Sequence, residues 1–205
     1  MSAPPTRLGL PNFRKVRFTD RLQVLSNKNI VLSGYRCSGK TCVGKHLARE
    51  LGRKFFDTDA LIEKKAQCSI ETIVLRHGWH CFRRIEKKVI EDLSRMGALV
   101  IASGGGVVMD EENVVNLKRR GFIVWLNAKA EVLKKRMLRD QKLGKFRPSL
   151  TGSDPLEEIM KVLSFRAPYY EKASDLIVDT STVFPRELAA LIIKKLPRLF
   201  GDRTT

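Results

Sequence analysis

The chain has 205 residues, a length that suits one domain, or two only if both are small. Its composition, 43% hydrophobic and 30% charged, is typical of a globular protein, and no apolar run approaches the roughly 20 residues that span a bilayer. The four cysteines form no Cys-x-x-Cys pair, which argues against a disulfide framework or a structural zinc site. Lys and Arg exceed Asp and Glu by 17, so we expect an anionic ligand or partner.

Residues 1–28 are basic, contain three prolines and show no sustained periodicity, so we predict a flexible N-terminal extension. The segment lacks the apolar stretch of a secretory signal. Its Arg-rich, acid-poor composition leaves two interpretations open, a loose tail or an organellar transit peptide. The loose tail is the simpler one and predicts a cytoplasmic protein. A short C-terminal tail is predicted at 198–205.

From residue 29 onward, short apolar runs alternate with segments of helical periodicity. The apolar runs predict strands at 29–33, 54–56, 98–102, 122–126 and 176–178. The periodic segments predict helices at 39–51, 58–66, 69–76, 79–95, 110–120, 129–139, 155–173 and 185–196. Glycine and proline interrupt residues 140–154, which we predict to be a mobile loop. This alternation indicates an α/β domain over 29–197, a three-layer sandwich with a parallel sheet covered on both faces.

Residues Gly34–Thr41 satisfy the pattern GxxxxGK[ST] between a predicted strand and a predicted helix. Backbone N–H groups of such a loop surround the phosphates of a nucleotide, and the helix N-terminus favours negative charge. Lys40 can reach the β- and γ-phosphates, and the Thr41 hydroxyl can ligate Mg²⁺. The predicted nucleotide-binding residues are Cys37, Ser38, Gly39, Lys40, Thr41 and Cys42.

Two further motifs follow predicted strands and so belong to the same edge of the sheet. Asp57 and Asp59 follow the second strand, where one carboxylate can hold hydrated Mg²⁺ and the other can orient or deprotonate an alcohol. Helix capping is the alternative for this pair. Gly104, Gly105 and Gly106 follow the third strand and allow a ligand to lie against the backbone, unless they form an ordinary turn.

With these motifs in this order, residues 29 to 196 resemble the shikimate kinase family, which phosphorylates the 3-hydroxyl of shikimate with ATP. The motifs that carry the resemblance are Gly34–Thr41, Asp57-Thr58-Asp59 with Glu63, Phe82-Arg83-Arg84-Ile85-Glu86, Ser103-Gly104-Gly105-Gly106, Arg147-Pro148 and Arg166-Ala167-Pro168-Tyr169-Tyr170. The resemblance implies a P-loop kinase fold of the nucleoside-monophosphate-kinase type, with strand order 2-3-1-4-5.

The resemblance also implies roles on the acceptor side, within an acceptor-binding segment at about 57–95. Arg83 and Arg166 would grip the shikimate carboxylate, to which a planar guanidinium can bind bidentately. Asp59 would be the base, Asp57 would hold Mg²⁺ through water, and Gly104–Gly106 would offer backbone to the acceptor. Glu86 could brace Arg83 across one helical turn. Surface salt bridges are the alternative for both arginines.

The loop at 140–154 corresponds to the family's lid. Its Arg147 would neutralise charge on the transferring phosphoryl group. Arg139 matches an adenine-stacking arginine if one residue is inserted before Arg147. Departures from the family pattern include Ser149 in the lid and the run Trp79-His80-Cys81, where acidic and small residues are typical.

We therefore predict a kinase that uses ATP and Mg²⁺ to phosphorylate shikimate. Its expected partners are small-molecule substrates, with no specific nucleic acid and no membrane, and we expect a monomer. Two alternatives stay open: a related kinase, such as one acting on gluconate, and a kinase-like binding protein without turnover that uses its basic surface.

Overall fold

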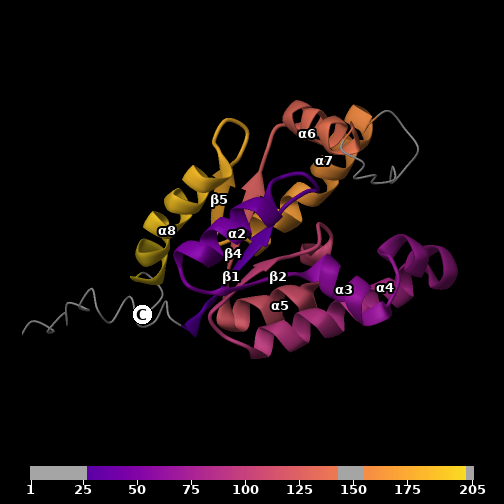
Figure 1. Cartoon of the computed structure of the whole chain (residues 1–205), viewed down its shortest axis with the longest axis horizontal. Coiled ribbons are helices and arrows are strands. Elements are labelled where there is room, and N and C mark those ends of the chain that lie inside the picture. Colours follow the sequence, from indigo (N-terminus) through magenta and orange to yellow (C-terminus); the bar gives the residue numbers. More distant parts are fainter. Residues whose placement is uncertain (1–26, 143–154, 202–205) are drawn as a thin grey trace, which may run out of the picture.

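A central five-stranded sheet organises the computed structural model, which describes residues 27–142 and 155–201. Its strands are β1 (Asn29–Ser33), β2 (Lys54–Asp57), β3 (Leu99–Ala102), β4 (Gly121–Asn127) and β5 (Leu176–Asp179). Every strand pairing is parallel, and the order is β2-β3-β1-β4-β5 (Figure 1). The predicted fold class and strand order are both confirmed.

Seven α-helices and one short 3-10 helix of the described residues cover this sheet. They are α2 (Lys40–Glu50), α3 (Thr58–Ala66), α4 (Ile70–Arg95), η1 (Val107–Met109), α5 (Glu111–Arg120), α6 (Ala130–Lys142), α7 (Pro155–Ala173) and α8 (Pro185–Gly201). Helices α2 and α8 lie against one face, and α3, α4 and α5 lie on the other (Figure 1). Helix α6 and the first part of α7 pack around Tyr35 and Ala128, beyond the carboxyl ends of β1 and β4. Tyr170 and Ala173, near the end of α7, belong to the cluster beneath α4 and α5.

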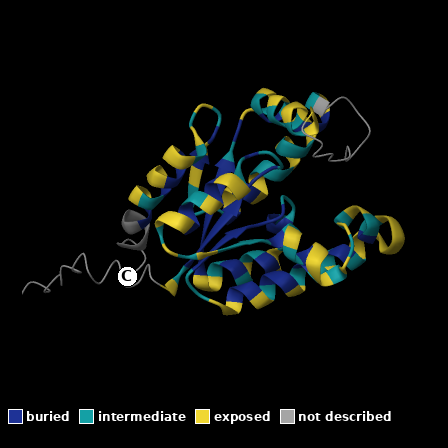
Figure 2. Ribbon diagram, in the orientation of Figure 1, coloured by how far each residue is buried: buried dark blue, intermediate teal, exposed yellow. Residues whose placement is uncertain are grey.

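The core forms two layers because side chains alternate along buried strands. In β1, Ile30 and Leu32 face the cluster beneath α2 and α8, whereas Val31 faces the cluster beneath α4 and α5. All five residues of β1 are buried, as are the four of β3 and all but the last residue of β4, and these central strands form the dark centre of Figure 2. Burial on both faces is why these strands are continuous apolar runs rather than alternating ones.

Three differences from the sequence-based prediction exceed one residue at an element boundary. The two helices predicted on either side of Gly78 form one element, α4, with a kink at Gly78, whose φ of 77° suits a residue without a Cβ. Helix α6 runs to Lys142 rather than 139, and the added residue Asp140 has a tertiary contact, its carboxylate 3.8 Å from the Cys37 thiol. Helix α8 continues to Gly201, past the predicted start of the tail at 198.

The predicted extension reaches the domain at its last two residues. The Asn27 carbonyl accepts a hydrogen bond from the Ala98 amide, and the Lys28 carbonyl accepts one from Arg53. The rest of the extension, most of the predicted lid with Arg147 and Ser149, and the last four residues lie outside the described residues. No helix in the described part of the chain is long and apolar enough to cross a membrane.

Candidate active site

The loop between β1 and α2 has the geometry of a phosphate-binding loop. Gly39 has φ 100° at the start of α2, and a Cβ at Gly34 would lie 2.5 Å from the Leu126 carbonyl oxygen, so both positions require glycine. The Lys40 ammonium donates to the carbonyls of Gly34 and Tyr35, each at 2.8 Å, and so lies over the loop. Helix α2 has no acidic residue in its first turn and no side-chain cap, which leaves its N-terminal N–H groups for an anion.

Two other segments hold the phosphate-binding loop in place. Arg136 of α6 donates to the Cys37 carbonyl at 3.3 Å, and the Thr180 hydroxyl donates to the Ser38 carbonyl at 3.1 Å. Arg136 also donates to the Thr180 hydroxyl at 3.1 Å, so the three contacts form one network. Burial lowers the pKa of Arg136, and the nearby charge of Arg139 lowers it further. Sequence analysis missed Arg136, because its contacts lie far along the chain.

The remaining predicted nucleotide-binding residues lie around this loop. Ser38 is buried, Cys37 is half-buried with φ 61°, and Cys42 is exposed in the first turn of α2. Arg139 is exposed on α6, near Arg136, on the helix that contacts the loop. The structure thus brings these residues together at one end of α2.

A hydroxyl and a carboxylate come together beside the loop. The Thr41 hydroxyl donates to Asp57 Oδ2 at 3.0 Å, and Asp57 Oδ1 accepts from the Asp59 amide at 3.1 Å. Asp57 therefore caps α3 with one oxygen and faces Thr41 with the other, so both sequence interpretations of Asp57 are compatible. Among the described residues, no group of three or more His, Cys, Asp and Glu could hold a metal. Oxygens of Thr41 and Asp57 suit Mg²⁺, which takes its other ligands from water and substrate phosphates.

The triple glycine after β3 brings the acceptor-side residues together. A Cβ at Gly104 would lie 2.8 Å from Asp59 Oδ1, and one at Gly106 would lie 2.7 Å from a terminal nitrogen of Arg83. At Gly105, a Cβ would lie 3.4 Å from the Gly34 carbonyl oxygen and 3.5 Å from Arg166. Side chains at these positions would occupy the space that the functional groups share. At Gly104 and Gly106 a Cβ would displace the ends of the Asp59 and Arg83 side chains, whereas at Gly105 it would make ordinary contacts.

Arg83 is braced by a buried glutamate on its own helix. Arg83 donates to Glu86 Oε2 at 2.6 Å, and the side chain of Glu86 is 1% exposed. Burial raises the pKa of Glu86, the Arg83 charge lowers it in part, and the Asp59 charge raises it further. The guanidinium carbon of Arg83 also lies 5.0 Å from the centre of the Phe82 ring and 5.7 Å from that of Trp79. The predicted brace is present, and the salt bridge is an intrahelical one at the site.

Among the described residues, Arg166 is held by a backbone carbonyl and by no carboxylate. Arg166 donates to the Gly105 carbonyl at 3.1 Å, and the hydroxyl of Tyr170 donates to the same oxygen at 2.5 Å. Tyr170 is buried and stacks on Trp125, with ring centres 5.4 Å apart. Burial raises the pKa of Tyr170 to about 12, so its hydroxyl remains a donor at neutral pH.

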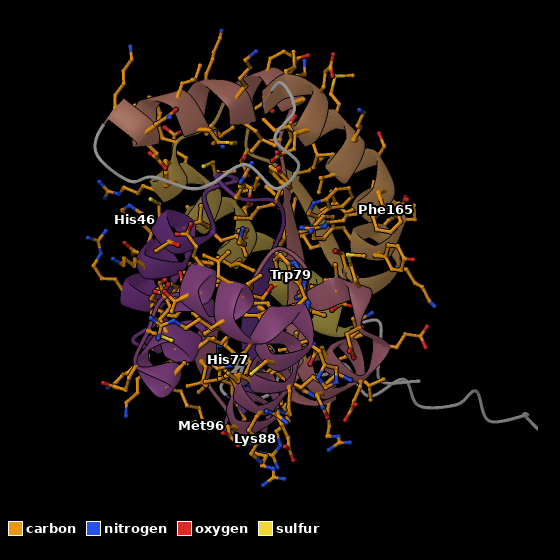
Figure 3. All side chains as sticks on the ribbon, turned by 90° about the vertical axis from the view of Figure 1, so that its right-hand side faces the viewer. His46, His77, Trp79, Lys88, Met96 and Phe165 are labelled. Carbon is orange, nitrogen blue, oxygen red and sulfur yellow. The ribbon has the colours of Figure 1, made fainter. Side chains whose placement is uncertain are left out.

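The two arginines approach the acceptor side from different helices. Trp79 of α4 lies one turn before Arg83, and Phe165 of α7 lies next to Arg166. Both aromatic side chains are exposed and lie on the same side of the molecule (Figure 3). His80, one of the departures from the family pattern, is exposed on α4. Arg83, Arg166 and Asp59 are themselves half-buried.

Comparisons with known proteins point to one family. A family model described as shikimate kinase matches residues 36–197. A shikimate kinase of Syntrophus aciditrophicus is 40% identical over 177 residues, covering 82% of this chain and 91% of that relative. A solved structure of the shikimate kinase from Acinetobacter baumannii in complex with shikimate matches with a TM-score of 0.78 and 32% identity, covering 90% of this chain and 99% of that one.

A gluconokinase is among the more distant solved structures that share the fold. A gluconokinase from Sinorhizobium meliloti is 19% identical with a TM-score of 0.54, covering 85% of this chain and 94% of that one. At this level of identity the likeness extends to the fold alone.

Proposed function

Because the chain belongs to the shikimate kinase family, we propose that it transfers the γ-phosphoryl group of ATP to the 3-hydroxyl of shikimate, giving ADP and 3-phosphoshikimate. The observation that carries this proposal is the approach of Gly105 to the Gly34 carbonyl, where a Cβ would lie only 3.4 Å away. This approach joins the phosphate-binding loop to the acceptor-side groups. A single site can then hold donor and acceptor together, which supplies much of the rate enhancement in phosphoryl transfer.

On the donor side, the N–H groups of residues 37 to 42 bind the phosphates, and the Lys40 ammonium exchanges its carbonyl contacts for the β- and γ-phosphate oxygens. Thr41 and Asp57 would hold Mg²⁺. When bound, the ion offsets negative charge on the β- and γ-phosphates. Arg147 adds a positive charge at the transferring group, and Arg139 contacts the adenine.

On the acceptor side, Arg83 and Arg166 bind the carboxylate of shikimate, and Gly104–Gly106 offer backbone groups to its ring. The Asp59 carboxylate accepts the proton of the 3-hydroxyl while its oxygen forms a bond to the γ-phosphorus. The bond from that phosphorus to the β–γ bridging oxygen breaks, and ADP leaves with the electron pair. The ion pair with buried Glu86 fixes the half-buried Arg83 guanidinium before the acceptor arrives.

A coupled assay of ADP release tests the proposal. Shikimate should stimulate turnover, and gluconate at equal concentration should not. Asp59→Asn should lower kcat at least about 100-fold, the scale of positioned acid–base catalysis. Asp92→Asn, an exposed aspartate of α4 that pairs with lysines, is the matched control and should retain the activity of the unchanged chain. Undiminished turnover in Asp59→Asn would overturn the assigned base, and faster turnover with gluconate would overturn the substrate.

We propose further that the chain works as a monomer in the cytoplasm, with small-molecule substrates and no specific nucleic-acid or membrane partner. Light scattering should give a mass near 23.3 kDa. Salt-sensitive DNA binding at physiological ionic strength without any phosphoryl transfer would favour the alternative of a binding protein instead.

A further inference from the structure

An ion pair far from any sequence motif connects the phosphate-binding loop to α7. Arg36, in the loop, donates to Glu158 Oε1 across 122 residues of chain. The side chain of Glu158 is 1% exposed and that of Arg36 is 13% exposed. Losing one partner of such a buried pair would strongly disfavour the charge that remains. An ion pair with this degree of burial is therefore expected to constrain its two elements far more than a surface pair does.

The pair lies beside an apolar contact between the same elements. Tyr35, the neighbour of Arg36, is 2% exposed and packs with Leu133 of α6 and Ile159 of α7 in the third core cluster. The Arg36 guanidinium carbon lies 5.6 Å from the centre of the Tyr35 ring. Loop and helix thus meet through a packed aromatic ring and a buried ion pair at adjacent positions.

Helix α7 also reaches the acceptor side, eight residues further on, at Arg166. Eight residues correspond to about 12 Å along a helix. Arg166 donates to the Gly105 carbonyl, and Gly105 lies beside Gly34 of the phosphate-binding loop. The loop and α7 therefore meet at two places, once through Arg36 and Glu158 and once around Gly105. Burial raises the pKa of Tyr35, while the charges of Arg36, Glu158 and Arg166 also act on it, so these groups share one environment.

The rate of phosphoryl transfer depends on the distance and orientation between the phosphate-binding loop and Arg166. The loop sets the position of the γ-phosphate, and Arg166 sets the position of the acceptor carboxylate. A displacement of about 1 Å between reacting groups can cost on the order of 100-fold in rate. A rigid connection between the loop and α7 would therefore favour a high rate, because it keeps the γ-phosphate and the acceptor aligned.

We propose that Arg36 and Glu158 are positioning residues, which hold the phosphate-binding loop and the Arg166-bearing helix α7 in a fixed relation. The inference has two halves. Its acceptor half, the effect on shikimate binding, rests on the proposed function. Its nucleotide half, the effect on ATP binding, rests only on the phosphate-binding loop. The pair touches neither the transferring group nor the acceptor in this assignment; it acts through the loop and through α7.

The variant Glu158→Gln keeps the shape of the side chain and removes its charge. We expect its KM values for ATP and for shikimate both to rise about tenfold, since both binding elements lose their alignment. Glu111→Gln is the matched control, because Glu111 pairs with Lys172 of the same helix α7 at 3.2 Å but both side chains are more than 80% exposed (89% and 81%). Its KM values should stay within about twofold of those of the unchanged chain.

Two measurements separate positioning from simple stabilisation. A merely structural pair would lower the thermal midpoint of Glu158→Gln and the fraction of active enzyme, while kcat per active molecule and both KM values stay unchanged; that result overturns the inference. Arg36→Lys keeps the charge and loses the planar fork, and should raise both KM values even if Glu158→Gln does not fold. Unchanged KM values in Arg36→Lys contradict the proposal as well.

A binding experiment keeps this inference separate from the proposed function. Calorimetry with a non-hydrolysable ATP analogue requires no acceptor, and Glu158→Gln should bind it about tenfold more weakly than the unchanged chain and Glu111→Gln. If the unchanged chain releases no ADP with shikimate, the proposed function fails. The three dissociation constants for the ATP analogue would still show whether the Arg36–Glu158 pair positions the phosphate-binding loop. Equal dissociation constants in all three proteins would refute that half.

Discussion

Replacing Arg83 with alanine removes one guanidinium from the acceptor side and leaves a carboxylate behind it. Glu86, which is 1% exposed, loses the partner that donates to it at 2.6 Å. The substitution should therefore affect acceptor binding and stability by separate physical routes. Lys40 contacts the carbonyls of Gly34 and Tyr35 rather than Arg83, so the KM for ATP should change little.

The size of the functional loss follows from the bond that Arg83 is assigned to make. A hydrogen bond to a charged group contributes about 1.5–3 kcal/mol. At about 1.4 kcal/mol per tenfold change, Arg83→Ala should lower kcat/KM for shikimate roughly 10- to 150-fold. Steady-state ADP release over a range of shikimate concentrations measures this directly.

The stability loss should be reversible by a second substitution. Removing one partner of a buried ion pair costs about 3–5 kcal/mol, but the raised pKa of Glu86 lets the carboxyl take up a proton, which limits the loss. In Arg83→Ala/Glu86→Gln a neutral amide replaces the carboxylate, so the thermal midpoint should recover most of its loss while kcat/KM stays low. Recovery of kcat/KM in the double variant, or an unchanged value in Arg83→Ala, would refute the assignment of Arg83.

Three further outcomes are expected from the same geometry. Gly106→Ala places a Cβ 2.7 Å from the mobile end of Arg83, so the KM for shikimate should rise about tenfold while calorimetry finds a nearly unchanged thermal midpoint. Asp57→Asn keeps a good N-cap on α3, so stability should change by less than about 0.5 kcal/mol while the Mg²⁺ concentration for half-maximal rate rises severalfold; an unchanged Mg²⁺ requirement would contradict the metal role. The raised pKa of Glu86 means that the folded state binds its proton more tightly, so stability is lost as the pH rises from about 4.5 through that pKa. Thermal unfolding of Glu86→Gln should lack this loss, and parallel pH profiles of the two proteins would contradict it.

The sheet and the nucleotide-binding loop could be predicted because their signals are local. The central strands β1, β3 and β4 are short runs buried on both faces, and their apolar character does not depend on which strand lies beside them. The loop from Gly34 to Thr41 needs glycine at fixed positions for its own backbone, which leaves a pattern within eight residues. The order of the strands in the sheet came from the family resemblance, because no local sequence pattern determines which strands pair.

Contacts between distant segments could not be predicted in the same way. Arg36 and Glu158, or Arg136 and Thr180, come together only after α6 and α7 have packed beyond the strand ends. Nothing in the residues around Glu158 distinguishes it from Glu157, yet one is buried and the other exposed. The end of α6 at Lys142 could not be predicted for the same reason, because the contact of Asp140 with Cys37 joins distant segments.

The arginines of the site differ in what holds them, and the difference bears on their roles. Arg83 is paired with the buried carboxylate of Glu86, so part of its charge is already balanced before the acceptor binds. Arg166 is oriented by the Gly105 carbonyl, a neutral acceptor, and no carboxylate of the described residues forms an ion pair with its guanidinium. A substrate carboxylate would therefore gain more electrostatic attraction from Arg166, whereas the brace on Arg83 favours precise orientation. Arg166 of α7 and Arg83 of α4 both lie beside Gly104–Gly106, where the absence of side chains leaves space for the acceptor.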